Sequence, residues 1–349
     1  MRGMIVDGFT INDASDCYII AEIGHNHQGD VNKCKEMIRE AKLAGASAVK
    51  LQKRDNKTLY TKAAYDKPYE NENSFGLTYG EHREFLEFNK EQYAELINYS
   101  REVGITFFAT AFDIASADFL EDLDIPAYKI ASGDLRNIPL IQHVAKFNKP
   151  MIISTGASTM EDVQRVYDAV RPINKQICFL QCTAGYPAAF EELNLRVIET
   201  YRKAFPDVVV GLSSHDNGIA MAVAAYVLGA RVIEKHFTLN RSLKGTDHSF
   251  SLEPVGLRKM ARDLKRLRGA LGDGFKRVFD SEKSAAHKMG KSIVAVRNLP
   301  AGTIISMDSL ALKSPGGGLA PYEIEKVLGK KLIRALDEDS PVSLEILSD

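Results

Sequence analysis

The chain has 349 residues, of which 45% are hydrophobic and 26% are charged, and its formal net charge is −1. This composition is typical of a globular protein with a sizeable core, and the length suits one large domain with a small one, or two medium domains. The balanced charge gives no overall attraction to nucleic acid or to an anionic membrane, so we expect neither as a partner. Because the sequence shows no apolar run of about 20 residues and no leader pattern, we expect no transmembrane helix and no signal peptide.

The four cysteines, Cys17, Cys34, Cys178 and Cys182, do not have the spacing of a metal-binding knuckle. Three of them, Cys17, Cys178 and Cys182, lie within or beside apolar runs, as reduced core thiols do. The cysteine pattern therefore favours the cytoplasm.

Short β-rich runs alternate with longer helical stretches along most of the chain. The eight expected strands are 17–24, 47–52, 105–112, 127–132, 150–156, 177–183, 208–214 and 231–239. The helices expected between them include 31–44, 90–103, 158–169, 191–204 and 217–228. Most of the strands are almost continuously apolar, which is typical of parallel strands covered on both faces. This pattern predicts an α/β fold, a TIM (β/α)8 barrel; a doubly wound open sheet is the alternative, but no G-x-G-x-x-G follows the first strand.

The alternation of strands and helices ends after a basic helix expected over 254–270. A glycine-containing link leads to brief apolar runs broken by Pro-Ala-Gly and Pro-Gly-Gly-Gly, which indicate tight turns in a small β-rich domain. We therefore expect a barrel domain over 1–274, a linker over 275–289 and a small domain over 290–349.

Polar side chains gather at the C-terminal ends of the expected strands, where a TIM barrel builds its active site. They are Glu22, Asn26, Lys50, Gln52, Thr110, Asp113, Lys129, Ser132, Asp134, Ser154, Thr155, Thr183, Tyr186, Ser213, Ser214, His215, Glu234, Lys235 and His236. The lysines and hydroxyls suit a phosphate and a carboxylate. A lone histidine in such a place is more often structural, but His215 and His236 come from adjacent strands and can meet on one cation. With oxygen ligands from substrate and water, that cation would be Mn²⁺ or Mg²⁺, and the absence of cysteine argues against a structural zinc.

Several stretches resemble the sialic acid synthases, also called N-acetylneuraminate or nonulosonate synthases. They are "AEIGHNHQGD", "AVKLQ", "AYKIASGD", "MIISTG", "FLQCTAGYP", "VGLSSHDNGIA", "VIEKHFTL", "GTDHSFSLEP" and, in the small domain, "LPAGT". The resemblance implies a TIM barrel followed by an antifreeze-like (SAF) domain. It also implies a transferase that condenses phosphoenolpyruvate with N-acetylmannosamine, or a related N-acyl hexosamine, to give N-acetylneuraminate and phosphate by C–O cleavage. The alternatives are N-acetylmannosamine 6-phosphate as acceptor, giving N-acetylneuraminate 9-phosphate, or another nonulosonate such as legionaminate.

The resemblance also implies roles for individual residues. Glu22, Asp134, His215 and His236 would be catalytic, and the two histidines would hold a divalent metal, Mn²⁺ with Mg²⁺ or Co²⁺ as alternatives. The substrate-binding residues would be Lys50, Gln52, Thr110, Lys129, Ser132, Ser154, Tyr186, Ser213 and Asp247. Asp134, Ala184 and Ser314 depart from residues common in the family, which are glutamate, asparagine and arginine. The protein would be a domain-swapped homodimer in which each small domain caps the partner's barrel.

Two other functions remain open from the residues alone. Lys129 could form a Schiff base in an aldolase that acts on free pyruvate. The small domain could instead bind carbohydrate or ice beside an inactive barrel. A further open question concerns the segment 53–67, which holds Lys53, Arg54, Lys57, Lys62 and Lys67 against Asp55 and Asp66 and could hold a phosphate on the acceptor sugar.

Overall fold

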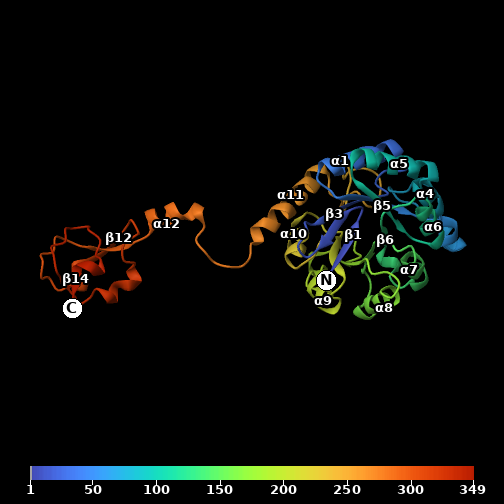
Figure 1. The fold of residues 1–349 in the computed structure, drawn as a ribbon. Helices are drawn as coiled ribbons and strands as arrows, with labels where there is room; N and C mark the ends of the chain where they lie inside the picture. Colours follow the sequence, from blue (N-terminus) through green and yellow to red (C-terminus); the bar gives the residue numbers. More distant parts are fainter. Residues whose placement is uncertain (1) are drawn as a thin grey trace. The chain divides into compact units, whose positions relative to one another are not determined.

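The structure is a computed structural model that describes residues 2–349, and its larger unit contains a closed barrel of eight parallel strands (Figure 1). The order around the barrel is β10-β3-β4-β5-β6-β7-β8-β9, so each strand neighbours the next one in the chain and β10 closes on β3. The strands are β3 (Tyr18–Gly24), β4 (Ala48–Lys53), β5 (Thr106–Ala111), β6 (Tyr128–Ile130), β7 (Met151–Ser154), β8 (Ile177–Cys182), β9 (Val209–Ser214) and β10 (Val232–His236). The predicted TIM barrel is confirmed, and the open-sheet alternative is wrong.

Helices surround the barrel, as expected for a parallel sheet whose outer face must be covered (Figure 1). They are α1 (Val31–Leu43), α5 (Lys90–Val103), α6 (Ile114–Asp122), α7 (Ile138–Ala145), α8 (Met160–Val170), α9 (Val197–Ala204), α10 (Ala220–Val227) and α11 (Pro254–Leu271). Local sequence sets their ends. Asn89 and Gln92 form a capping box at the start of α5, for example, and Gly104 ends that helix in the left-handed conformation.

The segment between β4 and α5 holds three short helices. They are α2 (Asn56–Leu59), α3 (Lys62–Tyr65) and α4 (Tyr79–Leu86). A capping box between Thr78 and Glu81 starts α4, and His82 and Leu86 on this helix are buried. This helix therefore has a fixed place above the barrel end, which matters for the site.

A hairpin that the sequence reading missed covers the N-terminal ends of the barrel strands. It consists of β1 (Gly3–Val6) and β2 (Phe9–Asn12), and it buries Met4 and Ile11 in the barrel core. Polar contacts reach the beginnings of two strands. The backbone N–H of Ile5 donates to Gln176 just before β8, and Thr106 at the start of β5 donates to Asp7.

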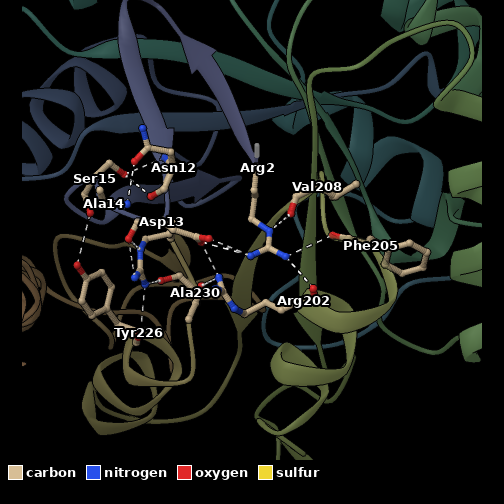
Figure 2. A network of polar contacts seen from close by, with 12 residues as sticks. Arg2, Asn12, Asp13, Ala14, Ser15, Arg202, Phe205, Val208, Tyr226 and Ala230 are labelled. Carbon is tan, nitrogen blue, oxygen red and sulfur yellow. Dashed lines mark hydrogen bonds and ion pairs between the residues drawn. The ribbon is translucent and has the colours of Figure 1, made fainter. Parts of the chain in front are cut away.

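Arg2 fixes the hairpin to the start of β9 (Figure 2). Its Nε donates to the carbonyl oxygen of Val208 at 2.6 Å, and its Nη2 donates to that of Arg202 at 2.7 Å. Asp13 balances the charge, because its carboxylate lies 3.2 Å from Arg2 and 2.7 Å from the guanidinium of Arg202. These partners offset the free-energy cost of burying the Arg2 guanidinium. Its contacts therefore hold the hairpin over this end of the barrel.

A second compact unit begins at Gly272. It contains α12 (Lys283–Met289) and two antiparallel pairs, β11 (Ser292–Ala295) with β12 (Leu310–Lys313) and β13 (Lys331–Leu332) with β14 (Leu347–Ser348). Its own small core is made of Ile293, Ala295, Leu299, Ile305, Val327, Leu332, Leu336, Val342 and Ile346. The expected linker over 275–289 thus includes a helix. Among residues 2–349, no helix has both the length and the apolar character that crossing a membrane requires.

Gly211 on β9 tests how closely the barrel is packed. A Cβ there would lie 2.3 Å from the carbonyl oxygen of Val232 and 2.5 Å from Leu180, both on neighbouring strands. We expect Gly211→Ala to lower the free energy of unfolding by about 1–3 kcal/mol, because the strand backbone cannot move away. Gly269→Ala in α11, where a Cβ meets nothing within 4 Å, should instead raise it by up to about 1 kcal/mol. Thermal melting of both variants measures this contrast, and equal melting temperatures would contradict it.

Candidate active site

A cavity of about 710 Å³ opens at the C-terminal ends of the barrel strands. Every residue to which the resemblance assigns a role lines it, except Asp134. Those residues are Glu22, Lys50, Gln52, Thr110, Lys129, Ser132, Ser154, Tyr186, Ser213, His215, His236 and Asp247. The structure thus brings together side chains from seven of the eight strands and from the segments that follow β6, β8, β9 and β10.

Strand register explains how the innermost residues meet. Glu22 on β3 is the register partner of both Lys50 on β4 and His236 on β10. Thr110 on β5 is likewise the partner of Gln52 on β4 and Lys129 on β6. Since parallel neighbours place side chains of the same register side by side, these residues form two successive levels at the strand ends, which Lys50 and Gln52 connect along β4.

Four buried ionised side chains alternate in sign at the inner end of the cavity, and we call them the charge row: Glu22, Lys50, Glu234 and Lys129. Lys50 Nζ pairs with Glu22 and lies 3.9 Å from Glu234 Oε1, while Lys129 Nζ lies 3.4 Å from the same oxygen. None of the four side chains is more than 6% exposed. Isolated charges could not be buried this deeply, so the row is stable only as a set.

The environment shifts the pKa values of the charge row in different directions. Burial raises the pKa of Glu22, and the pairing with Lys50 opposes it only in part. Burial also raises the pKa of Glu234, but the charges of Lys129 and Lys50 together bring that pKa below its usual value. Burial lowers the pKa of Lys129. Glu22 is therefore the member of the row that most readily takes a proton.

Hydroxyl groups surround the charge row. Ser213 Oγ donates to Glu234 at 3.3 Å, Thr110 Oγ1 accepts from Lys50 at 2.8 Å, and Ser132 Oγ accepts from the backbone N–H of Gly156 at 2.9 Å. Ser154 Oγ, by contrast, is buried and has no hydrogen-bond partner among the described residues. A buried hydroxyl without a partner is costly, which indicates that a ligand satisfies it.

The rings of His215 and His236 lie with their centroids 5.3 Å apart on the wall of the cavity. Nδ1 of His215 donates to the carbonyl oxygen of Thr183 at 2.9 Å, which leaves Nε2 with a free lone pair. His236 Nδ1 is buried without a hydrogen bond and lies 3.7 Å from Asp247 Oδ2. Burial and the neighbouring His236 lower the pKa of His215 to about 4, and burial lowers that of His236 too.

These two histidines fit a divalent metal ion. Both can offer a neutral imidazole nitrogen, one of them is held in place by a backbone carbonyl, and Asp247 adds a carboxylate nearby. Within residues 2–349, no three histidine, cysteine or acidic side chains converge closely enough to hold a metal unaided. A bound ion would therefore need further ligands from substrate and water.

Two predicted residues lie farther out. Tyr186 is 58% exposed at the mouth of the cavity, with its ring centroid 4.1 Å from that of His215. Asp134 lies on a short 3-10 helix after β6, half-buried and outside the lining, and burial raises its pKa to about 6. Its catalytic role stays a prediction.

The sequence reading missed several residues that line the cavity. Glu234 is one of the strand-end residues to which no role was assigned, although a carboxylate at a barrel rim that also carries Lys50 and Lys129 was a signal for ion pairing. Arg83 and Asn73 come from the segment between β4 and α5, where the sequence analysis assigned them no role. Of the five basic residues in 53–67, only Arg54 lines the cavity; Lys53 bonds to Glu87, and the three others are exposed.

Comparisons with known proteins agree with this geometry. The model of the NeuB family matches residues 37–276, and that of the SAF domain matches residues 290–346. The human N-acetylneuraminate-9-phosphate synthase is 44% identical over 95% of this chain and 93% of its own. The N,N'-diacetyllegionaminic acid synthase of Legionella pneumophila is 37% identical over 90% of both chains.

A solved structure is also similar. The N-acetylneuraminic acid synthetase of Leptospira borgpetersenii superposes with a TM-score of 0.71 at 29% sequence identity, covering 81% of this chain and 95% of that one. The family match extends over most of the barrel, and both relatives align over nearly their whole length. The chain therefore belongs to the NeuB family and carries a SAF domain after its barrel.

Proposed function

We propose that this protein is a sialic acid synthase that condenses phosphoenolpyruvate with N-acetylmannosamine or a related N-acyl hexosamine. The observation that carries the proposal is the pairing, in one cavity, of the charge row and its hydroxyls with the two histidines beside them. The first group suits a small phosphorylated acid, and the second suits an aldehyde that must be activated. Membership of the NeuB family supports the same reaction.

In this proposal phosphoenolpyruvate binds at the inner end of the cavity. Lys50 and Lys129 face its phosphate and carboxylate, and Ser154 donates the hydrogen bond that its hydroxyl does not make within the protein. A divalent ion at the two histidines, Mn²⁺ with Mg²⁺ or Co²⁺ as alternatives, would polarise the aldehyde of the sugar. Glu22 lies between these two places, as the register partner of both Lys50 and His236.

The bonds that change fix what the residues must do. C3 of phosphoenolpyruvate attacks the aldehyde carbon, water adds at C2, and the C–O bond to phosphate breaks. The new hydroxyl at the former aldehyde needs a proton, and Glu22 is the buried carboxyl with the raised pKa at that place. The lysines and hydroxyls hold the phosphate as its charge changes, so no Schiff base on Lys129 is required.

A second candidate acceptor is N-acetylmannosamine 6-phosphate. Condensation adds three carbons ahead of the sugar, so carbon 6 of the acceptor becomes carbon 9 of the product. The human relative, 44% identical, is named for a 9-phosphate product. That name favours a phosphorylated acceptor here as well, whereas the legionaminic acid synthase shows that sequence similarity of this level also spans other sugars.

We also propose that the protein is a cytoplasmic homodimer in which each SAF domain caps the cavity of the partner. The small domain exposes large apolar side chains, among them Tyr322 at 87% and Ile304 at 65%, which association would bury. All four cysteines are free and buried, as in a reducing compartment. Light scattering on the full chain tests the assembly, and a monomer at micromolar concentration would reject it.

The proposed reaction has a direct test. Phosphate release from phosphoenolpyruvate is measured with N-acetylmannosamine, its 6-phosphate, N-acetylglucosamine and no sugar. We expect one phosphate for each nine-carbon acid formed with a mannosamine acceptor, and none without sugar, because the leaving group departs only after the carbon–carbon bond forms. Inactivation by borohydride in the presence of pyruvate would point instead to the aldolase.

The metal assignment predicts a loss that can be reversed. EDTA should abolish turnover and Mn²⁺ should restore it, because the aldehyde then regains its activation. His215→Ala and His236→Ala should each lose at least about 100-fold in kcat with little change in melting temperature. His143→Ala, on the outer helix α7, serves as the matched control. Full activity in a metal-stripped sample would rule the assignment out.

Substitutions of Ser154 and of its neighbour Thr155 distinguish an effect on phosphoenolpyruvate binding from an effect on the stability of the fold. Ser154→Ala should raise the KM for phosphoenolpyruvate about tenfold without lowering the melting temperature, since the protein itself loses no hydrogen bond. Thr155 Oγ1 donates to Leu180 and accepts from Tyr201, so Thr155→Val should lower the melting temperature and leave that KM nearly unchanged. The reverse pattern would show that Ser154 is not in contact with the substrate.

A further inference from the structure

Two arginines line the active-site cavity without a carboxylate partner. Arg54 follows β4 and is 7% exposed, with its guanidinium 3.7 Å from the ring centroid of Phe112. Arg83 comes from α4 and lines the same cavity. Among residues 2–349, no acidic side chain forms an ion pair with either one, and the nearby Glu87 is bound to Lys53. An anion from outside the protein would stabilise two such cations in one cavity.

His25 lies between the two guanidinium groups. Its Nε2 is 3.2 Å from Arg54 Nη1, and its Nδ1 is 3.1 Å from Arg83 Nη1. Burial and the two arginines hold the pKa of His25 well below its usual range, so the ring is neutral and has a single acceptor nitrogen. Glu87 Oε1, which has no hydrogen-bond partner of its own, lies 3.7 Å from Nε2 and favours the hydrogen there. Nδ1 then accepts from Arg83, and the Nη1 of Arg54 is left without an acceptor.

The remaining donors are numerous. A guanidinium has five N–H groups, and for Arg54 the one clear acceptor is Gln52 Oε1 at 2.8 Å. Nε and Nη2 of Arg83 both donate to the hydroxyl of Tyr79, at 3.0 and 2.9 Å. Both side chains line the cavity, so their other donors are available to a bound ligand. A pair of forked guanidinium groups matches the oxygens of a phosphate.

The position of the pair identifies which phosphate. Asp247 lies 3.7 Å from His236, and its segment contacts the one that leads to Arg83, because the backbone N–H of Gly245 donates to Asn73 Oδ1 at 2.9 Å. Asn73, Arg83 and Asp247 all line the cavity. A sugar whose aldehyde is at the histidines can therefore extend past Asp247 toward the guanidinium groups. We propose that Arg54 and Arg83 bind a phosphate at the far end of the acceptor sugar, with His25 as a neutral spacer between them. This inference rests on the proposed function, which assigns phosphoenolpyruvate to the charge row.

The test compares two acceptors in matched variants. The ratio of kcat/KM for N-acetylmannosamine 6-phosphate to that for N-acetylmannosamine is measured in the parent, Arg54→Gln, Arg83→Gln and Lys57→Gln. We expect the parent to prefer the phosphorylated sugar and each arginine substitution to reduce the ratio by about 10- to 100-fold, because a hydrogen bond between charged groups is lost. Arg54→Lys should reduce it less. Lys57, a basic residue of the same segment that is exposed, should leave the ratio unchanged.

Binding measurements make the result independent of turnover. Calorimetric titration with the two sugars should show the same arginine-dependent difference in affinity, and thermal melting checks that each variant folds. An unchanged ratio together with a higher KM for phosphoenolpyruvate would overturn the inference, because the arginines would then serve the other substrate. Equal affinity of the parent and Arg54→Gln for the phosphorylated sugar would also overturn it. Arginine-dependent affinity without any phosphate release would keep the inference and reject the proposed function.

Discussion

The charge row is the interaction on which the rest of this structure depends. Its four members come from four strands, β3, β4, β6 and β10, and buried ions of this kind are tolerated only when each finds its partners. Glu22 and Glu234 lie on the two strands whose pairing closes the barrel. Closing the barrel and assembling the site are therefore one event, and a chain that failed to close would leave charged groups uncompensated in a low-dielectric interior.

The site divides into an inner part built by strands and an outer part built by connecting segments. Lys50, Thr110 and Lys129 have positions fixed by strand register. Arg83 and Asp247 lie on α4 and on the segment after β10, where insertions and substitutions are tolerated more easily. A change of acceptor sugar is thus compatible with an unchanged barrel, in line with relatives named for different products.

The same division explains what could be predicted from the sequence. The strands were predictable because long apolar runs identify buried parallel strands. The position of Lys50 and His236 at the cavity was predictable because both lie near the C-terminal ends of those strands. Arg83 was not predictable, since its contact with the cavity depends on how α4 folds back over the barrel. The hairpin was missed because β1 and β2 have only four residues each, and half of β1 faces solvent. Asp134 fell at a strand end in the sequence, but the short 3-10 helix takes it away from the cavity lining.

The hairpin held by Arg2 affects how ligands enter and leave the cavity. The hairpin covers the N-terminal ends of the strands and buried side chains fill the barrel interior, so the cavity opens at the C-terminal ends of the strands. Whatever occupies the inner end must enter before the molecule that lies above it, and it must leave after it. If phosphoenolpyruvate and the sugar bind at the places proposed for them, the acid at the inner end binds first and the sugar nearer the mouth binds second.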